Sequence, residues 1–381
     1  MIEPSEFIEL LKRQKINNFY GVPDSLLKPL CNYLIKLPPK IHELTTNEAM
    51  AVSSAIGSYL ATREMSCVYM QNSGLGNAVN PLVSLASAEV YAIPMLLLIG
   101  WRGEILKGDY QIKDEPQHSL QGKITLDQLK LMNIPFIILS KESFDWKVRV
   151  DSIIKEGKKK SIPVAIVFRK NTFLDKEESY GKQNYSEYFL TREKIIEIVG
   201  NKAPKDVPIF STTGMASREL YELRKKQNST TSDFLTVGGM GCASSIALGF
   251  IRASQRKKVI CIDGDGSILM HMGSLFKISK QKGFIHFVIN NNAHDSVGGQ
   301  STDAFDINFE MLGKALGYQY FASVESTENL NFILSEVFSQ DHIKSSLIEV
   351  RAKKGYRKDL GRPSESPKQN KDNFINQWSN L

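Results

Sequence analysis

Cysteine is scarce in this sequence, and its positions are widely spaced. The four cysteines, Cys31, Cys67, Cys242 and Cys261, form no Cys-x-x-Cys pair, and three of them fall inside apolar runs. This spacing excludes a disulfide-rich scaffold and a thiolate zinc site. It predicts reduced, buried thiols of a cytoplasmic protein.

Long apolar runs are also absent. No run reaches about 18 residues, the length that a membrane-spanning helix needs. The first residues, Met1 to Glu6, are acidic rather than basic, which is atypical of a secretory signal. We therefore expect no membrane partner and a cytoplasmic location.

The chain has no block of charge of one sign. Its net charge is +7, but lysine and arginine are spread along its length. The densest cluster, 158–160, lies between two predicted elements and is expected to be a solvated loop. We expect no nucleic-acid partner, and the basic excess suits a small anionic substrate at least as well.

Apolar runs alternate with amphipathic stretches in both halves of the chain. At 381 residues and 42% apolar content, the length suits two α/β domains. Strands are predicted within 18–25 and at 41–44, 65–70, 94–99, 136–139, 164–168, 208–211, 234–237, 258–262, 284–289, 318–321 and 346–350. The polar stretch 171–190 is expected to be the linker between domains 1–180 and 190–381, the second with a polar tail. Both halves are predicted to be similar open, mostly parallel sheets.

Polar side chains follow two strands of the second half. Asp265 lies in a Gly-Asp-Gly turn after one strand, and Asn290, Asn291 and Asn292 end the next. Carboxylate and amide oxygens are hard ligands that suit Mg²⁺ bound to a diphosphate. The pairing predicts a site for a phosphorylated cofactor.

Two glycine-rich turns join strands to helices. The segment 71–77 has the shape of an anion-binding loop, but Gly74 and Gly76 lack the third glycine of a dinucleotide fingerprint. The turn 238–241 contains three glycines. They would allow close approach of a ligand, or equally a tight strand–helix packing turn.

Glu48 opens a predicted Ala- and Ser-rich helix. With Thr45 three residues before it, Glu48 fits a capping box, and its charge complements the helix dipole. This local role suffices to explain the residue, so spacing alone does not make it catalytic.

Taken in order, these segments resemble the thiamine diphosphate (ThDP) enzyme superfamily. The resemblance implies that Asp265, Asn291 and the carbonyl of Ala293 hold Mg²⁺, with Asn292 an open alternative to Asn291 in register. It implies that Glu48, followed by Gly57 in its helix, contacts the aminopyrimidine ring of the cofactor. Further cofactor contacts are implied at Gly238, Met240, Gly264, Gly266 and Ser267.

A closer resemblance, to the phosphonopyruvate decarboxylase family, covers nearly the whole chain. It rests on six blocks in order: 21–28, 71–77, 100–104, 113–118, 293–300 and 359–367. The length leaves no room for the central third domain of larger ThDP decarboxylases. Two departures, the long loop 105–112 and Ser301 in place of a proline, leave the exact substrate open.

The resemblance implies decarboxylation of 3-phosphonopyruvate to phosphonoacetaldehyde and CO₂ in phosphonate biosynthesis. Substrate contacts are implied at Asp24, Ser25, Arg102 and Lys113, and proton transfer at His118 and His294. The two cations could also be ordinary exposed charges, and the two histidines ordinary loop residues. A homodimer or higher homo-oligomer is implied, with active sites between subunits.

Three rival interpretations remain open at this point. Sulfopyruvate decarboxylase shares the short two-domain plan. A ThDP enzyme could instead pass an aldehyde equivalent to an acceptor. A nucleotide-binding regulatory protein would need the diphosphate site but would have no use for Glu48.

Overall fold

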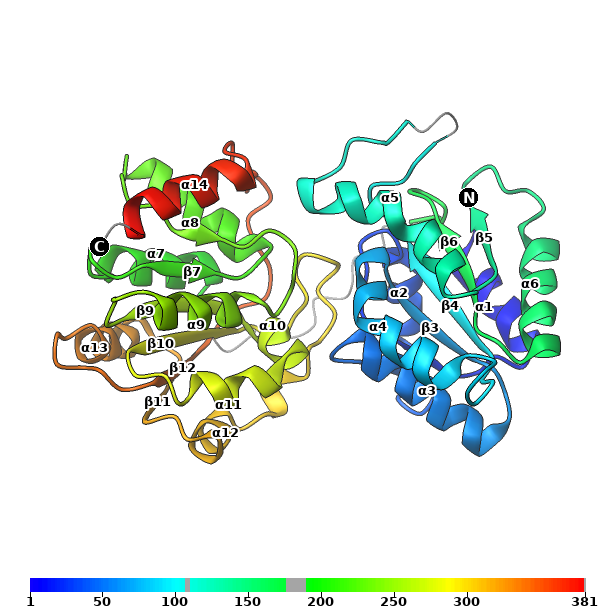
Figure 1. The fold of residues 1–381 in the computed structure, drawn as a ribbon, viewed down its shortest axis with the longest axis horizontal. Helices are drawn as coiled ribbons and strands as arrows, with labels where there is room; N and C mark the ends of the chain where they lie inside the picture. Colours follow the sequence, from blue (N-terminus) through cyan, green and yellow to red (C-terminus); the bar gives the residue numbers. More distant parts are fainter. Residues whose placement is uncertain (107–109, 176–189, 380–381) are drawn as a thin grey trace. The chain divides into compact units, whose positions relative to one another are not determined.

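The chain divides into two compact units, residues 1–181 and 182–381 (Figure 1). The computed structural model describes residues 1–106, 110–175 and 190–379. The described residues form no third unit, as predicted. Most of the predicted linker 171–190 and part of the loop 105–112 lie outside the described residues.

The first unit is built on a six-stranded parallel sheet in the order β2-β1-β3-β4-β6-β5. The strands are β1 (Phe19–Gly21), β2 (His42–Leu44), β3 (Ser66–Gln71), β4 (Met95–Gly100), β5 (Phe136–Leu139) and β6 (Val164–Phe168). The α-helices are α1 (Pro4–Arg13), α2 (Lys28–Leu34), α3 (Glu48–Thr62), α4 (Leu75–Pro81), α5 (Pro116–Leu131) and α6 (Trp146–Lys160). A 3₁₀ turn, Asn72–Gly74, precedes α4, and a π-helical turn, Leu82–Ala86, follows it.

The second unit repeats this topology. Its six parallel strands run in the order β11-β12-β10-β9-β7-β8, which is the same winding read from the other edge. The strands are β7 (Ile209–Ser211), β8 (Phe234–Leu235), β9 (Val259–Gly264), β10 (Phe284–Asn290), β11 (Tyr320–Val324) and β12 (Ser346–Arg351). The α-helices are α7 (Arg192–Lys202), α8 (Met215–Lys226), α9 (Ala243–Ala253), α10 (Asp265–Met270), α11 (Leu275–Ile278), α12 (Phe309–Leu316), α13 (Thr327–Val337) and α14 (Pro367–Trp378). Short 3₁₀ turns are Met272–Ser274 and Ala304–Asp306. The prediction of two similar open parallel sheets is confirmed.

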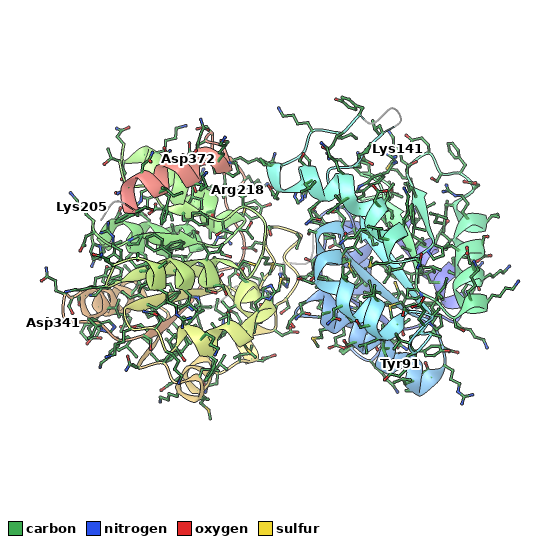
Figure 2. The ribbon with its side chains drawn as sticks, viewed as in Figure 1. Tyr91, Lys141, Lys205, Arg218, Asp341 and Asp372 are labelled. Carbon is green, nitrogen blue, oxygen red and sulfur yellow. The ribbon has the colours of Figure 1, made fainter. Side chains whose placement is uncertain are left out.

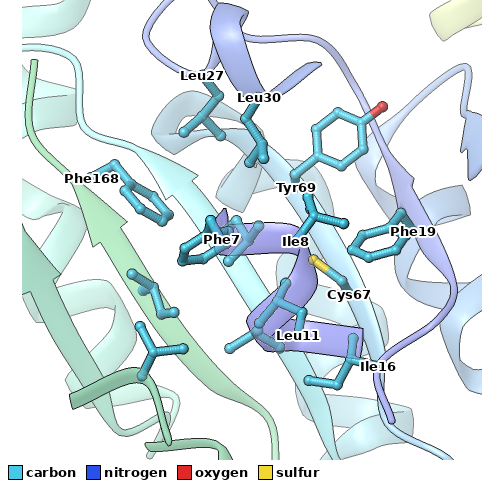
Figure 3. Close-up of a cluster of buried hydrophobic side chains, with 14 of the residues drawn as sticks. Phe7, Ile8, Leu11, Ile16, Phe19, Leu27, Leu30, Cys67, Tyr69 and Phe168 are labelled. Carbon is cyan, nitrogen blue, oxygen red and sulfur yellow. The ribbon is translucent and has the colours of Figure 1, made fainter. Parts of the chain in front are cut away.

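Helices cover both faces of each sheet, which explains the continuous apolar strands. Every residue of β4 is buried, because alternate side chains enter different cores. Leu96 and Leu98 join one core with α1, α2 and α6, whereas Leu97 joins another with α3 to α5. In the first of these cores, Phe7 of α1 packs edge-on against Phe168 of β6, with ring centroids 5.7 Å apart (Figure 3).

The C-terminal segment, predicted to be polar apart from Phe374, Ile375 and Trp378, ends in a packed helix. Ser366 forms a capping box with Gln369 at the start of α14. One face of the helix is buried through Phe374 and Trp378. Phe374 packs against three other aromatic rings of the second unit at centroid distances of 5.1–5.6 Å. The segment is polar on average, but Phe374 and Trp378 are four positions apart and so share the buried face of the helix.

The lysine cluster 158–160 is also placed differently from the prediction. These residues form the last turn of α6 and not a loop. Positive charge at a helix C-terminus interacts favourably with the helix dipole, so the cluster has a structural explanation.

Charged side chains such as Lys205 and Asp341 project outward from the second unit (Figure 2). Among the residues described, no helix combines the length and apolar character needed to span a bilayer.

Candidate active site

Glu48 is the first residue of α3, but the predicted capping box with Thr45 is wrong. The N-cap is Asn47, whose extended backbone lets its side chain accept a hydrogen bond from the amide of Met50. The Thr45 hydroxyl instead donates to the Asn47 carbonyl. Because Asn47 caps the helix, the Glu48 carboxylate is not required for capping.

The Glu48 side chain is held in a tight polar niche. It is buried, and its Oε2 accepts a hydrogen bond of 2.7 Å from Asn77 Nδ2 in α4. A Cβ on Gly74 would lie 2.4 Å from Glu48 Oε1, so a larger residue there would displace the Glu48 side chain. The loop that follows β3 therefore fixes this carboxylate in place.

Asp24 follows β1 and is fully buried. Its Oδ2 accepts the backbone amides of Leu26 and Leu27, while Oδ1 has no hydrogen-bond partner among the described residues. Burial raises the pKa of this carboxyl to about 6. A Cβ on Gly100 would meet Asp24 Oδ2 at 1.9 Å, so the end of β4 must be glycine. Asp24 thus lies where β1 and β4 end, at the carboxyl edge of the sheet.

Arg102 lies beside Asp24 and is already paired. Its guanidinium forms a two-pronged ion pair with Asp114, at 2.6 and 2.8 Å, and donates to Ser25 Oγ at 3.0 Å. Burial opposes ionisation of Asp114, but the hydrogen bonds and charge of Arg102 hold the pKa of that carboxyl well below its usual range. Arg102 is therefore a fixed cation and not a mobile surface charge.

The other two predicted residues of this unit flank the same loop. His118 is buried in the first turn of α5, with Nε2 4.0 Å from a Glu115 carboxylate oxygen. Lys113 is exposed just before Asp114. The structure thus gathers Asp24, Ser25, Arg102 and the 113–118 segment near the ends of β1 and β4. Glu48 lies at the start of α3, beside the loop after β3.

In the second unit, Asp265 begins α10 where β9 ends. Its carboxylate is buried and accepts a hydrogen bond of 2.5 Å from Thr302 Oγ1. Burial raises the pKa of Asp265 to about 6, although the Thr302 hydroxyl opposes the shift. No lysine, arginine or histidine within 190–379 forms an ion pair with it. A bound cation would stabilise the ionised form of this carboxylate.

Asn291 lies at the end of the neighbouring strand β10. Its Nδ2 donates to Asp295 Oδ2 at 2.7 Å, and its Oδ1 accepts the amide of Ala293 at 3.2 Å. Asn292 has a left-handed backbone, and its Oδ1 accepts bonds from the Ser301 and Thr302 hydroxyls. The pattern favours Asn291 over Asn292 as the residue that offers an amide oxygen.

Glycine-rich segments surround Asp265. Gly238, Gly239 and Gly241 all have positive φ, a conformation that side chains rarely adopt. A Cβ on Gly266 would meet the His294 ring at 2.8 Å and the Met240 methyl at 3.1 Å. Met240 and His294 therefore converge on the Gly-Asp-Gly turn.

Two other predicted residues belong to this cluster. The Ser267 hydroxyl is buried and bonds with Thr212 Oγ1 at 2.7 Å. His294 is partly buried, and burial lowers its pKa to about 4, so the ring is neutral near pH 7.

Comparisons with known proteins identify the family. A family model described as "Thiamine pyrophosphate enzyme, N-terminal TPP binding domain" matches residues 5–131, and the corresponding C-terminal TPP binding domain matches residues 211–350. Phosphonopyruvate decarboxylase from Streptomyces viridochromogenes is 30% identical over 382 residues, covering 96% of this chain and 92% of that protein. The chain belongs to the thiamine diphosphate-dependent enzymes. Its similarity over nearly the full length lies with the phosphonopyruvate decarboxylase family.

Sulfopyruvate decarboxylases are also similar to this chain. The protein from Methanosarcina acetivorans is 27% identical over 361 residues, covering 87% of each chain. The β subunit from Methanocaldococcus jannaschii is 36% identical over 155 residues, covering 40% of this chain and 77% of that subunit. The prediction of a ThDP-dependent carboxy-lyase is confirmed.

The residues present fit the cofactor of this family and a hard divalent cation. Asp265, Asn291 and the Ala293 carbonyl supply only oxygen ligands, the set that Mg²⁺ prefers. A buried carboxylate with a raised pKa and no cationic partner among the described residues is a suitable ligand for such an ion. The glycines at 238–241 and 266 leave room for close approach to the backbone.

Several contacts in the site could not be found from sequence. Asn77 lies in the sequence block 71–77, but it bonds to Glu48, which is 29 positions away in another helix. Asp114 accepts hydrogen bonds from Arg102, and Asp295 accepts one from Asn291. Each is a polar residue in one of the six sequence blocks, but the sequence gives no signal for its partner.

Proposed function

We propose that this enzyme catalyses the Mg²⁺- and ThDP-dependent decarboxylation of 3-phosphonopyruvate to phosphonoacetaldehyde and CO₂, in phosphonate biosynthesis in the cytoplasm. The observation that carries the proposal is the full-length similarity to phosphonopyruvate decarboxylases, combined with a buried Glu48 and an oxygen-ligand cluster at Asp265. We assign residues 1–180 to binding of the pyrimidine and residues 190–381 to binding of the diphosphate.

The difficult step in this reaction is the carbanion left when CO₂ departs, and bound ThDP supplies the electron sink for it. The role of Glu48 is to hold a proton at a pyrimidine nitrogen. Its niche suits this role, because Asn77 and the Gly74 backbone leave the carboxylate little freedom to turn away. The neutral amide of Asn77 orients the carboxylate and brings no competing charge.

In the second unit we assign Mg²⁺ to Asp265, Asn291 and the Ala293 carbonyl. Gly264, Gly266 and Ser267 would contact the diphosphate, and Gly238 and Met240 the pyrimidine. The packing of Met240 against the Gly-Asp-Gly turn supports a single compact binding surface for the cofactor within this unit.

A substrate with a phosphonate and a carboxylate needs fixed positive charge. Three of the five N–H groups of Arg102 bind Asp114 and Ser25, which leaves two for an anion. Lys113 adds an exposed, flexible charge beside it. We propose that these residues, with Asp24 and Ser25, bind the substrate, and that His118 and the neutral ring of His294 move protons.

We further propose a homodimer or higher homo-oligomer, in which Glu48 of one subunit and Asp265 of another serve the same cofactor. Co-expression of Glu48→Gln and Asp265→Ala chains tests this arrangement. In a mixed dimer one site would carry both changes and the other neither, so about one quarter of wild-type activity should return. A mixture as inactive as its parents, or an active monomer at low concentration, would argue against the shared site.

The direct test supplies purified protein with Mg²⁺, ThDP and phosphonopyruvate, and measures CO₂ and aldehyde. Sulfopyruvate is the necessary comparison, since the Methanosarcina relative covers 87% of this chain. A higher kcat/KM for sulfopyruvate would reverse the substrate assignment. A ligated product in place of the free aldehyde would indicate transfer to an acceptor.

A further inference from the structure

Asp295 is the centre of a buried polar network in the second unit. One of its oxygens, Oδ2, accepts bonds of 2.7 Å from both Arg192 Nη1 and Asn291 Nδ2. The other oxygen accepts the Gly355 amide at 3.0 Å. Arg192 in turn binds Glu219 through two bonds, at 2.8 and 3.0 Å. The network therefore connects α8 and α7 to the loop that carries Asn291.

The network is rigid for a physical reason. The side chains of Arg192, Glu219 and Asp295 are 9%, 2% and 6% exposed, so solvent hardly competes for their hydrogen bonds. Arg192 holds two carboxylates with a planar fork, which fixes direction as well as distance. Asp295 is consequently held in one orientation by groups that do not belong to its own loop.

This fixed carboxylate decides which atom Asn291 can offer to a cation. An asparagine amide can present either oxygen or NH₂ in the same place, and only oxygen binds Mg²⁺. An ionised carboxylate can only accept hydrogen bonds, so Asp295 selects the NH₂ group. The oxygen of Asn291 is then left on the other side, where it also accepts the Ala293 amide.

We propose that Asp295, held by Arg192 and Glu219, is a positioning residue that orients the Asn291 oxygen toward the metal. The inference rests on the proposed Mg²⁺ site and adds residues that make no contact with the metal. Partners of this kind, which orient a metal ligand, typically change metal affinity by about 10–100-fold when removed.

The test measures binding of Mn²⁺, as a paramagnetic substitute for Mg²⁺, to ThDP-saturated protein by the electron paramagnetic resonance signal of free Mn²⁺. Asp295→Asn should raise the Kd about 10–100-fold, because its amide no longer forces the NH₂ of Asn291 toward itself. Asn291→Ala, which removes the ligand, serves as the reference for full loss.

Asp233→Asn is the matched control. Asp233 is buried in the same unit and forms a comparable two-pronged pair with Arg224, at 2.7 and 3.2 Å, but none of its bonds involves Asn291. It should lose unfolding stability as Asp295→Asn does, yet keep the wild-type Kd for Mn²⁺. Asp295→Glu separates charge from position. This variant keeps the negative charge but moves the carboxylate, so a positioning role for Asp295 predicts weaker Mn²⁺ binding.

Several results would overturn the inference. Wild-type Mn²⁺ affinity in Asp295→Asn, together with loss of binding in Asn291→Ala, would refute the positioning role of Asp295 but not the metal site. Equal weakening of Mn²⁺ binding in Asp233→Asn would do the same. Absence of Mn²⁺ binding by the wild-type protein would instead refute the proposed metal site, and the inference with it. If Asp295→Asn does not fold, Arg192→Lys remains informative. It keeps the charge but loses the fork, and should weaken Mn²⁺ binding by a smaller factor.

Discussion

Replacing Glu48 with glutamine removes the carboxylate that can hold a proton but changes little else in the folded structure. The side chain keeps its size, and the amide oxygen of glutamine can still accept the 2.7 Å bond from Asn77. The loss of charge weakens that bond by about 1 kcal/mol, and the loss of a favourable helix-dipole interaction costs a further 0.3–1 kcal/mol or so. The folded state should therefore be destabilised by no more than about 2 kcal/mol, because Asn47 still caps the helix.

The effect on turnover should be much larger. Positioned acid–base groups contribute about 10²–10⁴-fold to rate, which corresponds to roughly 3–5 kcal/mol of barrier. We expect Glu48→Gln to lose kcat by that factor at saturating Mg²⁺, ThDP and phosphonopyruvate. Cofactor retention after dialysis should persist, whereas Asp265→Ala should lose it.

The assay follows aldehyde formation together with far-UV circular dichroism and the unfolding midpoint. Glu328→Gln is the control, because Glu328 is an exposed acidic residue in the first turn of α13 and its replacement makes the same chemical change. Turnover of Glu48→Gln within tenfold of wild type would refute the catalytic role. So would an equal loss in Glu328→Gln.

Three further predictions follow from the packing. Gly74→Ala should lower kcat about 10²-fold by displacing the Glu48 carboxylate, whereas Gly76→Ala, whose added Cβ meets nothing within 4 Å, should leave turnover unchanged. Asp24 has a folded-state pKa of about 6 against an ordinary 3.8, so its contribution to stability is present below pH 4 and lost as pH rises through 6. The unfolding free energy of Asp24→Asn relative to wild type should thus improve by about 2 kcal/mol between pH 4 and 7 in urea titrations, and a pH-independent difference would contradict this. Phe374→Ala should cost about 3–5 kcal/mol in unfolding of the second unit, because it empties an aromatic cluster; a loss below 1 kcal/mol would show that α14 is not integral to the core.

The strands were predictable because their signal is local. Strands buried on both faces are continuous apolar runs, and all twelve predicted segments overlap strands in the structure. Several helices were not predicted: α5, α6, α8, α10, α11, α13 and α14. The start of α14 is indicated by the capping box of Ser366 and Gln369, but the polar composition of the segment gives no clear helical pattern.

The start of α3 shows why local patterns do not settle a helix end. Thr45 and Asn47 are both good N-cap residues, and both lie next to Glu48. Only the backbone decides between them, and the extended conformation at Asn47 makes it the cap. Because Asn47 caps the helix, the Glu48 carboxylate takes no part in capping and accepts a hydrogen bond from Asn77.

The sequence by itself determined two open parallel sheets and the cofactor family, and it predicted the site residues, since each prediction depends on residue types within short segments. Tertiary structure alone decided which partners hold them. Asn77 with Glu48, Asp114 with Arg102, and Asp295 with Asn291 meet because separate elements pack together. A hydrogen bond depends on direction and on distances of a few tenths of an ångström, and chain spacing carries neither.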